Sequence, residues 1–276
     1  MPSFSFQCGV YSNSPLASNH LTSNSEVSLK GWISFANLIT WPLFTNLEHA
    51  VREGTDQVSR TFGVSGKQFY KEKFFKDEAS TKNFMDGMHG LSLATSPSVV
   101  KAFNFSEFKT VCDFGGGTGA LAYELCRVYP EMSIKVLELP PVAKVAAKYF
   151  EPQDGKSAKV EFVPGDFFEK ELPAADMYIF SQVFHNWQED KIHQLLKKAH
   201  KTLKPGGAVL LVEHLFNDDK TGPPPVTVRC LLMLLGSEGR ERTKEEYTQL
   251  LEVNGFKDVQ FKPTGVLQTA ILARRL

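Results

Sequence analysis

The chain of 276 residues has no excess of either charge and no long hydrophobic run. Its 31 basic and 31 acidic residues balance, so the overall charge gives no reason to expect a nucleic acid or an anionic membrane as partner. The longest apolar run, Cys230 to Leu235, is far shorter than the about 20 residues that span a bilayer. The start of the chain also lacks the basic and apolar stretches of a secretion signal. We therefore expect a cytoplasmic protein without membrane contacts.

Cysteine is sparse as well. The four cysteines, Cys8, Cys112, Cys126 and Cys230, form neither a CxxC pair nor a pattern with histidine at metal-ligand spacing. Cys112 lies inside an apolar segment that is typical of a buried strand. We expect a reducing compartment and no metal site.

The chain does contain a glycine cluster between a strand pattern and a helix pattern. An apolar segment ends at Asp113 and Phe114, the glycines follow, and an amphipathic helical pattern begins at Ala120. A chain that turns at once from a buried strand into a helix needs backbone angles, and a close ligand approach, that side chains would block. This predicts a site for a nucleotide-type ligand.

Strand and helix patterns alternate after residue 100. We expect strands at 110–114, 133–138, 160–163, 175–182 and 208–213, two more near Val259 and Ala270, and helices at 120–129, 141–149, 192–203, 228–235 and 243–254. The alternation predicts an α/β fold, with a mostly parallel sheet covered by helices on both faces and a ligand beyond the carboxyl ends of the strands. Lys197, Lys198, Lys201 and Lys204 are interpreted as a solvated helix face, and residues 222–225 as a loop.

The first hundred residues have a different character. Residues 1 to 25 are rich in Ser, Asn and Pro, and we expect them to be loosely structured. Residues 26–51 indicate a helix interrupted by Pro42, and residues 69–84 indicate another. The sequence thus predicts a helical N-terminal segment, 1–100, and an α/β domain, 101–276.

The glycine cluster alone leaves two ligands open. Gly115, Gly117 and Ala120 fit the G-x-G-x-x-G/A pattern of a nicotinamide-dependent oxidoreductase, with Glu138 at the distance of its ribose acid. Asp113 favours the other ligand, because a carboxylate repels a pyrophosphate but attracts the amino group and sulfonium of S-adenosylmethionine. The charge therefore favours the methyl donor.

The ends of the next strands carry further candidate residues. Glu138 can accept hydrogen bonds from both ribose hydroxyls, and Gly165, Asp166 and Phe167 offer an acid and an aromatic face for an adenine. His185 follows the fourth strand, where a neutral imidazole can take the proton of a hydroxyl that attacks the sulfonium methyl group. The remaining acceleration can come from holding donor and acceptor in line.

Six segments resemble a known family when they are taken together. They are Asp113 to Ala120, Glu138 to Val142, Gly165 to Phe168, Val183 to Trp187, Lys204 to Gly207 and Gly239 to Thr243. In order and spacing they resemble the class I S-adenosylmethionine-dependent O-methyltransferases, especially the acetylserotonin O-methyltransferase group, over residues 10–276. The resemblance implies a Rossmann-like sheet with an antiparallel last strand and a helical remnant of a winged-helix dimerisation domain. It also implies a homodimer through the N-terminal helices.

The resemblance also implies roles for individual residues. Glu213 and Glu241 would flank His185, where a carboxylate on one ring nitrogen leaves the other free to accept a proton. Gln182 would touch the cofactor where the family usually has Arg or Lys. The residues implied at the acceptor are Asn186, where the family usually has Asp, together with Trp187, Leu232 and Gly236. Leu232 and Gly236 stand where acetylserotonin O-methyltransferases place polar substrate contacts.

The sequence therefore supports three functional hypotheses. The first is an S-adenosylmethionine-dependent O-methyltransferase that acts on a small aromatic hydroxyl compound of indole or phenol type. The second is a catalytically impaired relative that binds the cofactor without turning over an acceptor, motivated by Gln182, Asn186, Leu232 and Gly236. The third is the nicotinamide-dependent oxidoreductase, which Asp113 disfavours.

Overall fold

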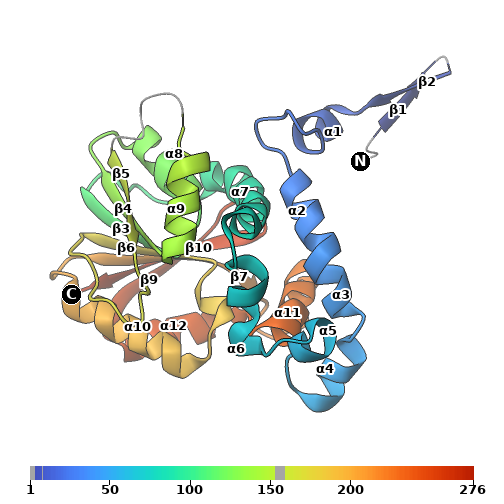
Figure 1. The fold of residues 1–276 in the computed structure, drawn as a ribbon. Helices are drawn as coiled ribbons and strands as arrows, with labels where there is room; N and C mark the ends of the chain where they lie inside the picture. Colours follow the sequence, from blue (N-terminus) through green and yellow to red (C-terminus); the bar gives the residue numbers. More distant parts are fainter. Residues whose placement is uncertain (1–3, 8, 153–158) are drawn as a thin grey trace.

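A mixed sheet forms the centre of the protein, whose computed structural model describes residues 4–7, 9–152 and 159–276. The strand order is β5-β4-β3-β6-β7-β10-β9 (Figure 1). The short strand β8 pairs with β7. The strands are β3 (Thr110–Phe114), β4 (Ser133–Glu138), β5 (Val160–Pro164), β6 (Met177–Ser181), β7 (Ala208–Phe216), β8 (Arg242–Thr243), β9 (Phe256–Pro263) and β10 (Gln268–Arg275). Strands β3 to β7 run parallel, whereas β10 is antiparallel to both of its neighbours. The predicted mostly parallel α/β sheet with an antiparallel last strand is confirmed.

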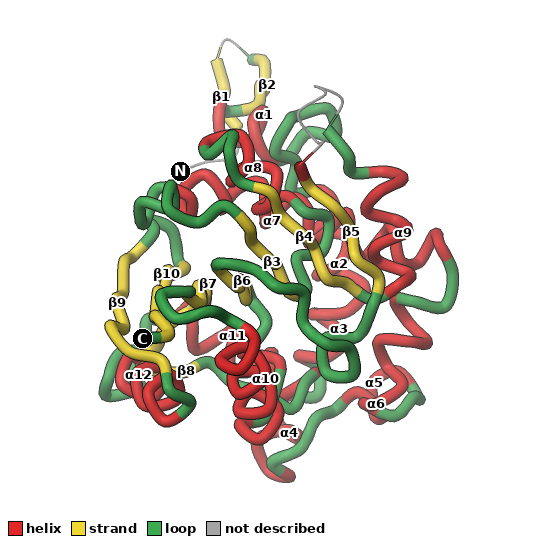
Figure 2. Tube along the Cα trace, turned by 90° about the vertical axis from the view of Figure 1, so that its left-hand side faces the viewer, coloured by secondary structure: helices red, strands yellow, loops and turns green. Residues whose placement is uncertain are grey.

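Helices cover both faces of this sheet (Figure 2). They are α7 (Glu78–Val100), α8 (Ala120–Val128), α9 (Pro140–Tyr149), α10 (Glu189–Thr202) and α12 (Lys244–Val253). Helix α10 buries Ile192, Leu195, Leu196 and Ala199 at helical spacing against one face, as its apolar pattern predicts. The C-terminal end of α7 and helix α8 cover the other face. No helix in the described part of the chain is long and apolar enough to cross a membrane.

A third apolar cluster lies among the N-terminal helices. These elements are α1 (Pro15–His20), α2 (Lys30–Phe35), the π-helix η1 (Ala36–Thr40), α3 (Trp41–Phe44), α4 (Leu47–Glu53), α5 (Val58–Phe62), α6 (Gly66–Phe69) and the π-helix η2 (Tyr70–Phe74). Leu43, Ala50 and Phe74 pack there against Leu235 of α11 (Pro224–Gly236). Helix α11 therefore joins the N-terminal helices to the sheet domain, as Figure 1 shows beside α3.

The N-terminal segment differs from its sequence-based prediction in two places. Strands β1 (Phe4–Gln7) and β2 (Val10–Asn13) form an antiparallel hairpin where we expected loose chain. Pro42 does not interrupt the helical path, which continues from α2 through η1 into α3. In the widened turn of η1, the Trp41 N–H donates to the Ala36 carbonyl, and Pro42 follows in the first turn of α3, where a missing N–H is tolerated.

Two further element boundaries were predicted wrongly. The expected helix over residues 69–84 is broken, because Asp77 caps a new helix by accepting the Ser80 N–H at 2.7 Å. The expected loop at 222–225 is partly helical, because α11 begins at Pro224 and proline fits the first turn of a helix.

Candidate active site

Asp113 lies directly beneath the glycine loop at the end of β3. Gly115 and Gly117 adopt positive φ angles of 66° and 59°, and a Cβ at Gly116 would overlap the Asp113 carboxylate. Neither carboxylate oxygen has a hydrogen-bond partner among the described residues. Burial, and then the charge of Glu138, raise the pKa of Asp113 to about 7. An unpartnered buried carboxyl fits a cationic ligand group lying over this loop.

Glu138 ends β4 beside the same loop. Its Oε1 accepts the Gly117 N–H at 3.1 Å, and its Oε2 accepts the Leu139 N–H at 2.8 Å. Burial raises the pKa of this carboxyl to about 7 as well. Each oxygen keeps a lone pair, so the carboxylate can still accept two hydroxyl donors of a ribose.

The loop after β5 faces the glycine turn. The Phe167 ring lies beside Gly115, where a Cβ would come within 3.7 Å of it. Asp166 caps its own turn by accepting a backbone N–H at 2.8 Å, and Gly165 donates its N–H to the Glu138 carbonyl at 2.8 Å. Lys198 of α10 donates to three carbonyls of this loop at 2.7 to 2.9 Å. The sequence predicted that Lys198 is solvated, and this prediction is wrong. Its partners are backbone carbonyls about thirty positions earlier in the sequence, which a local helix pattern does not reveal.

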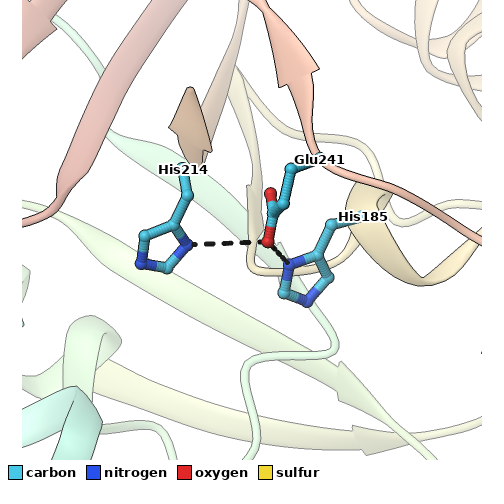
Figure 3. Close-up of side chains that lie close together, drawn as sticks. All are labelled: His185, His214 and Glu241. Carbon is cyan, nitrogen blue, oxygen red and sulfur yellow. Dashed lines mark hydrogen bonds and ion pairs between the residues drawn. The ribbon is translucent and has the colours of Figure 1, made fainter. Parts of the chain in front are cut away.

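The residues described so far, around Asp113, Glu138 and the loop after β5, form one half of the site. His185 and Glu241 form the centre of the other half. His185 lies in the short 3₁₀ helix η4 (Phe184–Asn186) after β6 and is 4% exposed. Its Nδ1 lies 3.0 Å from Oε1 of Glu241, which is 1% exposed. A carboxylate only accepts, so Nδ1 carries the hydrogen, and Nε2 is the nitrogen that can accept a proton from a substrate. Figure 3 shows Nε2 on the side of the ring away from Glu241.

Glu213, at the end of β7, supports the same turn. Its Oε1 accepts the backbone N–H groups of Val183 and Phe184 at 3.1 and 2.8 Å. Its Oε2 lies 3.7 Å from Nδ1 of His185. Burial raises the pKa of Glu213 to about 7, against the opposing charge of His185. Glu213 therefore holds the backbone of the turn and faces the imidazole from a second side.

Two residues that the sequence did not single out, His214 and Arg229, complete this cluster. Nδ1 of His214 lies 3.9 Å from Oε1 of Glu241, opposite His185 (Figure 3). Burial, and then the charge of Arg229, lower the pKa of His214 to about 3, so this ring is neutral. Nε of Arg229 lies 3.5 Å from the same oxygen. Burial alone would raise the pKa of Glu241, but the His185 hydrogen bond and the charges around it lower the pKa.

His185, His214 and Glu241 also form a group that could hold a metal ion, since one ligand atom from each lies within 4.8 Å of the others. The sequence did not predict this group, because its members come from three segments without regular spacing. Arg229 places a fixed positive charge 3.5 Å from the shared carboxylate. That charge opposes the binding of a second cation at the same oxygen.

The segment from Gly239 to Thr243 clamps the histidine turn. A Cβ at Gly239 would overlap the His185 carbonyl oxygen, so only glycine allows this approach. Arg242 is 1% exposed and donates to the carbonyls of Phe184 and Trp187 at 3.2 and 3.3 Å. Glu241 lies between Gly239 and Arg242 in the sequence, so these contacts place its carboxylate against the ring of His185.

Gln182 links the two halves of the site. It adopts a positive φ of 56°, and its Nε2 donates to the Val212 carbonyl at 2.9 Å while its Oε1 accepts from Arg229 at 2.8 Å. Asn186 donates to the Gln182 carbonyl at 3.1 Å, so its amide nitrogen closes the turn. The Trp187 ring packs edge-on against Phe168, with ring centroids 4.8 Å apart.

Leu232 and Gly236, the other two residues implied at the acceptor, lie on α11. Leu232 packs into the apolar cluster of the N-terminal helices. A Cβ at Gly236 would come within 3.2 Å of Cδ1 of Leu43, so α3 fills the space beside this glycine. The surroundings of Leu232 and Gly236 on α11 are therefore apolar.

The fold and the site together define a Rossmann-like methyltransferase. A family model for the O-methyltransferase domain matches residues 44–257, and the chain belongs to this family. This membership decides against the nicotinamide-dependent oxidoreductase that the glycine cluster alone had left open.

Particular relatives are similar over almost the whole chain. Human acetylserotonin O-methyltransferase is 37% identical over 96% of this chain and 76% of its own length. The human probable bifunctional dTTP/UTP pyrophosphatase/methyltransferase protein is 40% identical over 96% of this chain, which spans only 43% of that relative. The crystal structure of human N-acetylserotonin methyltransferase in complex with S-adenosylmethionine superposes with a TM-score of 0.92 at 36% identity. That match covers 99% of this chain and 78% of the other.

Proposed function

We propose that the protein transfers the methyl group of S-adenosylmethionine to a hydroxyl of a small aromatic acceptor of phenol or indole type. The observation that carries the proposal is the buried pair of His185 and Glu241, with Nδ1 and Oε1 3.0 Å apart, so that Nε2 on the other side of the ring is the nitrogen available to a substrate. Similarity to acetylserotonin O-methyltransferase supports the same reaction class.

On the donor side, the proposal assigns cofactor contacts to residues at the ends of four strands, β3, β4, β5 and β6. The set is Asp113, Gly115, Gly117, Glu138, Gly165, Asp166, Phe167 and Gln182. Asp113 is the strongest of them, because its buried carboxylate has no hydrogen-bond partner among the described residues and suits a cation. Glu138 would accept the ribose hydroxyls, and Phe167 would lie against the adenine.

On the acceptor side, His185 would take the hydroxyl proton on Nε2 as the oxygen attacks the methyl carbon. Glu241 would stabilise the resulting imidazolium, and Glu213 would hold the turn that carries it. The wall formed by Asn186, Trp187, Leu232 and Gly236 would enclose the ring of the acceptor.

Calorimetry and a methylation assay test this proposal. The wild-type protein is expected to bind S-adenosylhomocysteine and to methylate members of a phenol panel. His185→Ala should keep the binding and lose about 10²- to 10⁴-fold in turnover, the usual contribution of a general base. Turnover that survives His185→Ala would exclude the histidine as the base.

A second candidate function is cofactor binding without acceptor turnover. It is favoured by Leu232, which is apolar, and by Gly236, which has no side chain and lies close to Leu43. Neither position can make the polar substrate contacts expected there. Tight binding of S-adenosylhomocysteine, with no methyl transfer to any acceptor of the panel, would favour this candidate.

We also propose that residues 1–100 cap the site of the 101–276 domain and form a homodimer. Apolar side chains on the outer face of the N-terminal helices support this, with Ile33, Leu38 and Trp41 exposed by 51%, 62% and 69%. Trp41→Asp should raise the monomer fraction in light scattering, whereas Val253→Asp on α12, also 69% exposed, should not. A wild-type monomer at high concentration would contradict the proposal.

A cytoplasmic location is proposed from the cysteines. Cys112, Cys126 and Cys230 are free thiols, and Cys8 lies outside the described residues. Free thiols suit a reducing compartment. Fractionation of cells that express the protein tests this location.

A further inference from the structure

Arg229 is a cation close to the proposed base, and the proposed reaction assigns no role to it. It lies on α11 at positions i, i+3 and i+7 with Leu232 and Gly236, so the three residues share one helix face. Its guanidinium reaches the two residues beside the proposed base, Gln182 and Glu241. Arg229 thus lies beside the residues that contact the proposed base, on the same helix as two residues of the proposed acceptor site.

Among the described residues, Arg229 makes a hydrogen bond to Gln182 and keeps further donors available. Nη2 donates to Gln182 at 2.8 Å, whereas Nε is buried without a hydrogen-bond partner in the part of the chain that the structure describes. The 3.5 Å separation from Glu241 is an ion pair without a hydrogen bond. The side chain as a whole is 24% exposed, so Arg229 is not sealed inside the fold. A guanidinium has five N–H donors in a planar fork that matches a carboxylate.

The charges around Arg229 change during the proposed reaction. Before proton transfer, Glu241 balances the charge of Arg229 across 3.5 Å. After His185 gains a proton, the same carboxylate must also balance the imidazolium 3.0 Å away. Glu213, 3.7 Å from Nδ1 of His185, also faces the imidazolium, but Glu241 must then share its charge between Arg229 and the ring. An anionic group on the acceptor would offset the weakened pairing of Arg229.

We propose that Arg229 binds a carboxylate of the acceptor, so that the preferred substrate is an aromatic compound with both a hydroxyl and a carboxylate group. This inference rests on the proposed O-methyltransferase function and deepens it. It names the specificity-determining residue as well as the class of substrate.

A pair of acceptors that differ only in charge provides the test. We compare kcat/KM for 3,4-dihydroxybenzoate and for its methyl ester, with S-adenosylmethionine saturating. The wild-type protein should prefer the acid by about 10- to 100-fold, the range of a charge-assisted hydrogen bond. Equal values, or a preference for the ester, would overturn the inference while leaving the methyltransferase function intact.

Variants separate binding from a structural role. Arg229→Met should lose the preference through a higher KM for the acid, with the ester less affected, and Arg229→Lys should keep part of it. Arg127→Met, which removes an arginine paired with Glu124 on α8, is the matched control and should behave as wild type. Equal losses for acid and ester in Arg229→Met would show that the arginine only supports Gln182 and Glu241, and would overturn the inference.

Two measurements keep the inference testable if turnover fails. Calorimetry with the S-adenosylhomocysteine complex compares binding of the acid and of the ester directly. A stronger binding of the acid that Arg229→Met abolishes would support the inference even without turnover. Weaker binding of S-adenosylhomocysteine to Arg229→Met, with no difference between acid and ester, would assign Arg229 to the carboxylate of the cofactor and overturn the inference.

Discussion

Replacing Glu241 by glutamine isolates the charge of this residue from its shape. The amide carbonyl of Glu241→Gln can still accept the Nδ1–H of His185, so the ring should keep its orientation and tautomer. The variant removes the negative charge that would stabilise the protonated ring. It also leaves the Arg229 guanidinium, 3.5 Å from the replaced oxygen, without its counter-charge.

The size of the effect follows from the distances. Two unit charges 3.0 Å apart attract each other by about 5 kcal/mol at an effective dielectric constant of about 20. Glu213, 3.7 Å from the same nitrogen, retains part of this stabilisation. We therefore expect kcat to fall by about 10²- to 10³-fold, which corresponds to about 3 to 4 kcal/mol.

Single-turnover methyl transfer at saturating S-adenosylmethionine measures this loss without product release. Glu238→Gln is the matched control, because Glu238 directly precedes the Gly239–Thr243 segment but is exposed. The double variant with His185→Ala should be no slower than His185→Ala alone, because both residues act as one unit. Activity of Glu241→Gln within about threefold of wild type, or additive losses in the double variant, would refute this reasoning.

Three further predictions concern the donor side and the metal question. Lys198→Met should raise the Kd of S-adenosylhomocysteine about tenfold, because the loop after β5 loses a charged donor, and exposed Lys197→Met should not. Asp113 has a raised pKa of about 7, so its protonation stabilises the ligand-free fold at low pH and this contribution is lost as the pH rises towards 7. Asp113→Asn should therefore raise the free energy of unfolding at pH 8 by up to about 4 kcal/mol but change it little near pH 4, and weaken S-adenosylmethionine binding. Equal urea-denaturation shifts at both pH values would contradict this. EDTA should leave kcat/KM unchanged, and a loss restored by zinc would assign a metal to His185, His214 and Glu241.

The sheet was predictable because its signals are local. The buried strands are short apolar segments, and the glycine loop and the face of α10 follow from spacing within a few residues. The positions of Asp113 and Glu138 at strand ends also follow from these patterns, since parallel strands end at one edge of the sheet. The boundary errors at Pro42 and Pro224 arose because proline was read as a breaker where it occupies the first turn of a helix.

The side-chain cluster around Glu241 was only partly predictable. His185 and Glu241 are 56 positions apart, and only the resemblance to a family joined them. His214 and Arg229 belong to no motif, and each looks like an ordinary strand or helix residue in the sequence. Their contacts are made between distant segments, so no local pattern contains them. The same reason explains why Lys198 was interpreted as a surface residue.

The two pairs of buried acids have complementary parts in the proposed reaction. Asp113 and Glu138 would lie beside the bound cofactor, whose sulfonium charge is lost on methyl transfer, whereas His185, next to Glu241 and Glu213, would gain one positive charge from the acceptor hydroxyl. Asp113, Glu138 and Glu213 have pKa values raised to about 7, so each can lose its charge when no cation is near. Glu241 is the exception, because its lowered pKa keeps it ionised beside His185 and Arg229 throughout. The permanent negative charge is therefore located where the reaction creates a cation, which favours the transition state over the ground state.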